Sequence, residues 1–206
     1  ELIAAAQKEK TSTDYVSRTL PENKNQTVSW NYLPGTLSEA NAIIKIASQK
    51  ETKVKLYSGE AAVEESFKNL SGVQSPRVIH IATHGFFFPD NKNETGSTTE
   101  EKKNFRISED PLNRAGILFA GANLAWNGTP VDEVEDGILT AYEACNVTLT
   151  NTQLIVLSAC ETGLGEIKGS EGVFGLQRAF KSAGTEYIMM SLWKVPDSET
   201  AEFMSQ

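Results

Sequence analysis

The chain has 206 residues, of which 39% are hydrophobic and 22% charged, and its formal net charge is -8 at pH 7. This length is enough for one domain with a sizeable core. The acidic balance excludes a nucleic-acid surface, because phosphate binding needs clustered lysine and arginine. Only two cysteines occur, which is typical of a reducing compartment, and no stretch approaches the roughly 20 apolar residues of a membrane span. We therefore expect a cytoplasmic protein without direct nucleic-acid or membrane contact.

The N-terminal third begins with a weakly patterned stretch and continues into a clear helix. Residues 1–32 predict a helix remnant followed by a connector. Residues 33–50 predict an amphipathic helix, because apolar residues recur at helical spacing, at Ala40, Ile43, Ile44 and Ala47. Thr36 and Glu39 have the spacing of a capping box at its start. A short strand, a turn and a second helix follow within residues 52–70.

Three apolar runs predict inner strands of a sheet. They read "RVIHIATHG" (77–85), "QLIVLSAC" (153–160) and "EYIMMSLW" (186–193). Near-continuous apolar sequence is typical of strands covered on both faces. A helical pattern with Gly184 at its C-terminal cap separates the last two runs. Alternation of strands and helices indicates a mostly parallel sheet, whose ligands bind at the carboxyl ends of the strands.

The region between the first two runs departs from this alternation. Residues 86–111 are long, polar and of mixed charge, so they form either a functional loop or a disordered segment. The run "RAGILFAGANLAW" (114–126) and the run "DGILTAYEA" (136–144) then predict a hairpin-like excursion and a short helix.

One cysteine and one histidine stand at the ends of predicted strands. His84 and His80 fall four apart in one predicted strand, and His84 is at its carboxyl end; we interpret His80 as a packed residue. Cys160 occupies the equivalent place on another strand. If the two strands are neighbours, the thiol and the imidazole meet, which is sufficient for a nucleophile and its proton-transfer partner. Gly85 would let backbone N–H groups approach an oxyanion.

Other readings of these residues remain open at this point. A cysteine that ends a strand is more often a packing residue than a nucleophile. Cys145 is interpreted as a small apolar residue on a short helix. The cysteine and histidine spacings do not resemble a zinc site, and no phosphate-binding or dinucleotide-binding fingerprint occurs, so neither a metal nor a cofactor is expected.

The chain resembles the CHAT-domain family, caspase-like and separase-like cysteine peptidases found mostly behind tetratricopeptide repeats. The similarity is carried in order by "LPGTLSEA", "VIHIATHGFF", "PLNRAGILFAGAN", "DGILTAYEA" and "LIVLSACETGLGEIKGSEG". It runs from about residue 33 to the end. The resemblance implies a domain over residues 33–206 and makes residues 1–32 a connector from an upstream helical repeat region. CHAT domains normally continue beyond the last helix seen here, so we expect the C-terminal part to be missing.

The resemblance also implies a fold and a site. The fold is an α/β three-layer sandwich with a mostly parallel sheet flanked by helices. His84 is the proton-transfer residue, Cys160 is the nucleophile, and the backbone N–H groups of Gly85 and Cys160 are the oxyanion donors. Asp197, in "SLWKVPD", resembles the separase residue that reads a basic P1 side chain, although an acid there could equally cap the following helix.

Three functions follow. The first is an endopeptidase that cuts a protein partner under control of an upstream repeat region or a regulatory protein, in a bacterial defence or cell-death pathway. The second is a scaffold or protein-binding module that keeps the fold while catalysis is idle. A non-peptidase acyl transferase with the same residues is a third. Preferential labelling of Cys160 over Cys145 by an electrophile discriminates an active site from a scaffold.

Overall fold

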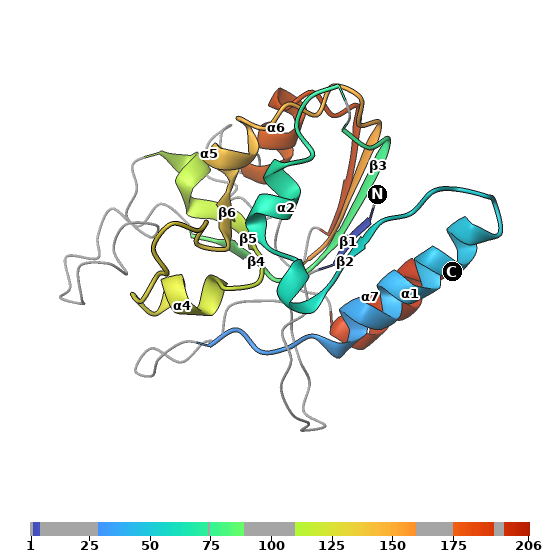
Figure 1. Ribbon diagram of the computed structural model, residues 1–206, viewed down its shortest axis with the longest axis horizontal. Helices are drawn as coiled ribbons and strands as arrows, with labels where there is room; N and C mark the ends of the chain where they lie inside the picture. The colour runs from blue at the N-terminus through green and yellow to red at the C-terminus, as the bar shows by residue number, and fades with distance from the viewer. Residues whose placement is uncertain (1, 5–28, 74, 89–109, 160–174, 192–195) are drawn as a thin grey trace.

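A five-stranded parallel sheet organises the protein. The computed structural model describes residues 2–4, 29–73, 75–88, 110–159, 175–191 and 196–206, and of residues 2–4 the backbone alone. Across this part of the chain the strand order is β2-β1-β3-β7-β8 (Figure 1). The strands are β1 (Leu2–Ala4), β2 (Leu56–Tyr57), β3 (Val78–Ala82), β7 (Leu154–Ser158) and β8 (Tyr187–Met190). All four pairings are parallel.

Helices cover both faces of this sheet. On one face, α1 (Pro34–Ser48) and α7 (Asp197–Met204) pack side by side (Figure 1). On the other face lie α2 (Glu64–Lys68), α5 (Ala141–Ala144) and α6 (Gly175–Ser182). The predicted three-layer α/β sandwich of the caspase-like type is therefore confirmed. Among the described residues no helix is both long and apolar enough to cross a bilayer.

A second, antiparallel sheet lies beside the first. Its strand order is β4-β5-β6, formed by β4 (Gly85–Phe87), β5 (Ala115–Leu118) and β6 (Ile138–Thr140). Between β5 and β6 the chain forms α4 (Ala122–Trp126), and short 3₁₀ turns occupy η1 (Gly59–Ala61) and η3 (Pro111–Arg114). The predicted hairpin-like excursion is confirmed, and β4 extends it into the beginning of the polar stretch 86–111. Residues 89–109 of that stretch lie outside the described part.

The main core lies between the two sheets and the helices α2, α5 and α6. Its largest fully buried side chains include Phe67, Phe119 and Phe180, whose ring centroids lie 6.0 Å apart in both neighbouring pairs. Alternate residues of β3 and β7 face this core, because side chains along a strand alternate between its faces. The opposite residues, including His80 and Ser158, face α1. This division places buried polar side chains on the α1 side of the sheet.

Three expectations about local structure need correction. The capping box at Thr36 and Glu39 is wrong: Leu33 is the N-cap of α1, the Thr36 hydroxyl donates to the Leu33 carbonyl, and Glu39 points into the core. A capping box does form elsewhere, at Thr140 and Glu143 on α5. The helix remnant expected near the N-terminus is also wrong, because the backbone of β1 pairs with β2 and β3 there.

Strand β8 was expected to be covered on both faces, and this too is wrong. It pairs with β7 and forms an edge of the sheet among the described residues. Tyr187 is 62% exposed and Met189 is 49% exposed, while Ile188 and Met190 pack against the core. The helix before it ends as expected, since Gly184 has a φ of 106°, a conformation that favours glycine.

Candidate functional site

His84 lies in a bend between the two sheets. Strand β3 ends at Ala82 and β4 begins at Gly85, so His84 does not share a strand with His80, contrary to the prediction. Strand β7 is the direct neighbour of β3, with Ala82 opposite Ser158, and the Thr83 N–H donates to the Ser158 carbonyl at 3.3 Å. The neighbouring strands on which the site prediction depends are therefore present.

Cys160 lies outside the described residues, two positions after the end of β7. The backbone that leads to it is held by its neighbours up to Ala159, which is fully buried. The Ser191 hydroxyl, just beyond β8, donates a hydrogen bond to the Ala159 carbonyl. Gly85, the predicted oxyanion donor, is the buried first residue of β4 and lies opposite Ile117. Its role and that of Cys160 stay predictions.

The His84 imidazole is bound by a backbone carbonyl from a distant part of the chain. Its Nε2 lies 2.7 Å from the carbonyl oxygen of Asn31. A carbonyl oxygen can only accept a hydrogen bond, so Nε2 carries a proton in this arrangement. In the neutral ring Nδ1 is then the nitrogen that can accept a proton. This is the protonation state that a proton-transfer residue needs before it meets a thiol.

An aromatic group packs behind this imidazole. The Trp30 indole lies 5.0 Å from the His84 ring, centroid to centroid, and 5.1 Å from that of Trp126. Trp30 is 3% exposed, and Phe86 and Phe88 extend the same cluster. A pocket beside His84 is lined by Trp30, Asn31, Leu33, Thr83, Leu118, Phe119, Ala120 and Ala122. The imidazole thus stands at the edge of a largely apolar pocket.

The segment that carries Trp30 and Asn31 is anchored to α4. The Asn123 side chain accepts a hydrogen bond from the Trp30 N–H at 2.8 Å and donates one to the Trp30 carbonyl at 3.1 Å. Both backbone groups of one residue are therefore satisfied by a single amide. Such a pair of hydrogen bonds fixes the local backbone much as a neighbouring strand would.

The second histidine belongs to a buried polar network under α1. His80 is 5% exposed, and its Nε2 lies 2.5 Å from Oε1 of Glu39. The Ser158 hydroxyl donates to Oε2 of the same carboxylate at 3.0 Å. Glu39 therefore joins α1 to β3 and β7 from a fully buried position. This agrees with the interpretation of His80 as a packed residue, and it explains why Glu39 is not a helix cap.

Asp197 is buried against the start of α1. It is 5% exposed, and its Oδ2 accepts a hydrogen bond from the Gly35 N–H at 2.6 Å. An ideal Cβ placed on Gly35 would lie 2.7 Å from the Asp197 backbone carbonyl oxygen, so a larger residue there requires the backbone to shift. The carboxylate thus satisfies an N–H group in the first turn of α1, where a negative charge is favourable. In the alternative reading Asp197 caps its own following helix, but the N-cap of α7 is Pro196, and Asp197 is the first residue of that helix.

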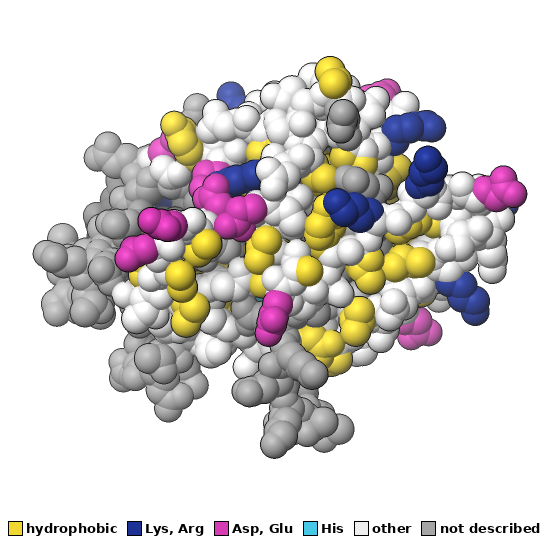
Figure 2. All heavy atoms as spheres, in the orientation of Figure 1, with side chains coloured by type: hydrophobic (Ala, Val, Ile, Leu, Met, Phe, Trp, Pro, Cys, Tyr) yellow, Lys and Arg dark blue, Asp and Glu magenta, His cyan; other side chains and the backbone are white. Residues whose placement is uncertain are grey.

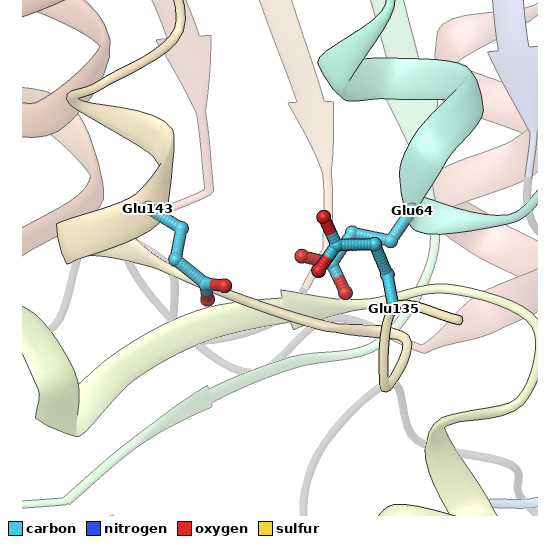
Figure 3. Close-up of side chains that lie close together, drawn as sticks. All are labelled: Glu64, Glu135 and Glu143. Carbon is cyan, nitrogen blue, oxygen red and sulfur yellow. The ribbon is translucent and has the colours of Figure 1, made fainter. Parts of the chain in front are cut away.

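A cluster of carboxylates lies apart from His84. Glu64 on α2, Glu143 on α5 and Glu135 on the loop before β6 place oxygens within 4.8 Å of one another, and Figure 3 shows the three side chains converging. The Lys68 ammonium lies 2.7, 2.9 and 3.1 Å from Glu64, Glu135 and Glu143. Figure 2 shows acidic side chains gathered around a basic one over this region. Lysine already supplies the positive charge at this cluster.

Burial acts strongly on one member of the cluster. It raises the pKa of Glu64 from 4.5 to about 7, and the hydrogen bond from Lys68 opposes this effect. Burial likewise raises the pKa of Asp136. The carboxylates around Lys68 raise the pKa of that ammonium against the opposing effect of its burial. The cluster is a structural ion-pair network that links α2, α5 and the 133–137 loop.

Comparison with family models identifies the chain. The CHAT-domain model matches residues 2–206. The protein belongs to the CHAT-domain family. CHAT domains are peptidase-like, of the caspase-like type, which agrees with the parallel sheet and its flanking helices. A comparison with curated proteins finds no match to this chain. The match includes residues 2–32, which the sequence suggested were a connector, and the division at residue 33 stays a prediction.

The surroundings of His84 and His80 contain residues that sequence reasoning missed. Trp30, Asn31 and Asn123 were not singled out, although Asn123 lies within the quoted "RAGILFAGAN" run. Trp30 and Asn123 are 93 positions apart, so no local spacing joins them. Glu39 was noticed only as a cap. The sequence contained one signal for the role of Glu39. This carboxylate lies on the apolar side of the predicted helix, and a carboxylate buried there needs partners.

Proposed function

We propose that this CHAT domain is a cysteine endopeptidase in which Cys160 is the nucleophile and His84 transfers protons. The observation that carries the proposal is the place of His84, immediately beyond β3 and bound through Nε2 to the Asn31 carbonyl. Strand β7, which leads to Cys160, is the direct neighbour of β3. Membership of a peptidase-like family supports the same chemistry.

The proposed reaction divides peptide hydrolysis into two steps. His84 Nδ1 takes the thiol proton, and the thiolate attacks the peptide carbonyl carbon. The tetrahedral intermediate collapses as the imidazolium protonates the leaving amine, which breaks the C–N bond and leaves a thioester. A water molecule, deprotonated by His84, then attacks the thioester and releases the acid and the thiol. Backbone N–H groups of Gly85 and Cys160 would stabilise the oxyanion in both steps.

A free thiol has a pKa of about 8.5, so the thiolate is a minor species at neutral pH without help. A neighbouring imidazole supplies that help, since an ion pair with imidazolium favours the thiolate. The apolar pocket beside His84 strengthens this interaction, because charges attract more strongly where water is excluded.

We propose that Asp197 contributes to recognition of a basic P1 side chain. Two features support this proposal. The carboxylate is buried, and a buried negative charge favours a cationic partner. Asp197 also binds the N–H group of Gly35, and Gly35 lies four positions beyond Asn31, whose carbonyl binds His84. One short segment therefore contacts both Asp197 and His84.

The wider context is proposed from the family resemblance. The substrate is a protein partner, and an upstream helical repeat region or a bound regulatory protein controls the site in a bacterial defence or cell-death pathway. The cytoplasm is the proposed location. A catalytically idle scaffold is the alternative that the following experiment is designed to detect.

Identification of new N-termini tests this function. The full-length protein is incubated with a proteome-derived peptide library, and new termini are identified by mass spectrometry beside Cys160→Ala and His84→Ala variants. We expect termini that are absent from both variants, with lysine or arginine enriched before the cut. If the wild-type protein gave no more new termini than Cys160→Ala, the proposal would be overturned in favour of a scaffold. Termini without basic enrichment would remove only the role of Asp197.

A further inference from the structure

The side chain of Asn123 makes contacts that the proposed reaction leaves unexplained. It lies in the first turn of α4, and its amide binds both the N–H and the carbonyl of Trp30. The two bonds, at 2.8 and 3.1 Å, join segments 93 positions apart. An amide that satisfies both backbone groups of one residue restrains the peptide planes on both sides of it. The orientation of the Asn31 backbone is therefore set from α4.

The restrained backbone leads directly to the imidazole. The carbonyl of Trp30 belongs to the peptide group that enters Asn31, and the carbonyl of Asn31 accepts from His84 Nε2 at 2.7 Å. The side chain of Asn31 is exposed. Trp30 is 3% exposed and packs on both His84 and Trp126. The anchor of this carbonyl is thus the Trp30 residue before it, which Asn123 and Trp126 hold.

We propose that Asn123 is a positioning residue that holds His84 in the tautomer with a proton on Nε2. The inference rests on the proposed function, because only a proton-transfer histidine needs one fixed tautomer. Loss of the Asn123 bonds frees the Trp30 and Asn31 backbone, so the carbonyl no longer binds Nε2 in a fixed geometry. The imidazole then divides between two tautomers, and Nδ1 is protonated, and unable to accept the thiol proton, in part of the population.

The tautomer can be measured without any peptidase assay. The 206-residue chain contains two histidines, so ¹⁵N-histidine labelling of this chain gives two imidazoles in a long-range ¹H–¹⁵N spectrum. The spectrum of His84→Ala assigns them. His80, bound to Glu39, reports whether the fold is intact. In Asn123→Ala we expect the ratio of the Nε2–H to the Nδ1–H form of His84 to fall by about two- to tenfold, the range of one neutral hydrogen bond.

Asn127, which follows the last residue of α4, supplies the matched control. Asn127 donates through Nδ2 to the Asn123 backbone carbonyl at 2.8 Å, whereas the bonds to Trp30 come from the Asn123 side chain, so Asn127→Ala should leave the His84 ratio unchanged. Asn123→Asp keeps an acceptor for the Trp30 N–H and replaces the donor by an oxygen. Because that oxygen faces the Trp30 carbonyl and cannot donate to it, Asn123→Asp should also lower the His84 ratio. It also carries the test if Asn123→Ala disturbs the His80 signals.

The outcomes separate the two proposals. A His84 ratio unchanged from wild type, in whichever Asn123 variant keeps the His80 signals, overturns the positioning role. A changed ratio in a protein that cleaves nothing supports the positioning role and contradicts the peptidase. If the positioning role and the peptidase function are both correct, the pH profile of Cys160 alkylation should differ between wild type and the Asn123 variants. It should stay the same in Asn127→Ala.

Discussion

The Nε2 nitrogen of His84 lies 2.7 Å from the carbonyl oxygen of Asn31, a residue 53 positions earlier in the chain. This contact joins the bend after β3 to the segment that enters α1. The same segment carries Trp30, which packs on the imidazole, and Gly35, which binds Asp197. Residues 30–35 therefore connect His84, the candidate proton-transfer residue, to Asp197, the candidate specificity residue.

Removal of the Trp30 indole should destabilise the protein and loosen His84. Trp30 is 3% exposed, and truncation of a buried tryptophan typically lowers the free energy of unfolding by about 3–5 kcal/mol. Trp30→Ala should show this loss in urea unfolding. Trp30→Phe keeps a ring against His84 and should lose clearly less. If both variants lost the same free energy of unfolding, the phenylalanine ring would contribute nothing. The contact between an aromatic ring and His84 would then not stabilise the protein.

Asp197→Ala should weaken the start of α1. It removes the acceptor of the Gly35 N–H, and loss of a capping acceptor reduces the free energy of unfolding by about 0.5–2 kcal/mol. Asp197→Asn keeps an acceptor oxygen and should lose less. If Asp197 also reads the P1 residue, both variants should lose the preference for basic peptides. A preference retained in Asp197→Asn would leave the bridge to α1 as its role.

Much of the fold follows from local pattern. The apolar runs that form β3 and β7 are recognisable because strands buried on both faces need apolar side chains in both directions. The α6 C-terminus is recognisable because Gly184 supplies the positive φ of the cap. The position of His84 beyond a strand end follows from the same reasoning, although the break between Ala82 and Gly85 was not anticipated.

The remainder depends on partners that local pattern does not contain. Tyr187 and Met189 belong to an apolar run that is typical of an inner strand. In the described sheet β8 lies at the edge, and the order of the strands is not encoded in the local pattern. Thr36 and Glu39 have the spacing of a capping box, and burial against His80 determines where Glu39 points. Asn123 and Trp30 meet only in the folded chain.

Glu39 should be the most sensitive polar residue of the core. Its two oxygens bind His80 and Ser158 from a fully buried position. Glu39→Ala removes the acceptor of both hydrogen bonds from a buried site, so the free energy of unfolding should fall by about 3–5 kcal/mol in urea unfolding. Ser158→Ala removes one neutral donor and should lose about 1–2 kcal/mol. A smaller loss for Glu39→Ala than for Ser158→Ala would contradict the network.

Glu64 should make the stability depend on pH. Burial raises its pKa from 4.5 to about 7, so between these values the unfolded chain releases the proton while the folded chain retains it. The free energy of unfolding should therefore fall as pH rises through this window, by up to about 1.4 kcal/mol per pH unit, and level off above it. Glu64→Gln should lose this fall, so its stability relative to wild type should increase with pH.

Glu65→Gln is the matched control for this measurement, because it changes the next residue on α2. Urea unfolding at several pH values between about 4.5 and 8 compares the three proteins. The control should keep the wild-type slope. Parallel curves for Glu64→Gln and wild type would show that Glu64 does not carry the proton in the folded state.

The most direct measurement of the central claim is site-resolved alkylation of the full-length protein by a thiol-reactive peptide electrophile, followed by mass spectrometry. Cys145, half-buried at the end of α5, is the internal reference. If His84 and Cys160 form a working pair, Cys160 reacts about 10²-fold or more faster than Cys145, and His84→Ala removes most of that difference. Equal labelling of Cys160 and Cys145 in wild type, unchanged by His84→Ala, would contradict the pair.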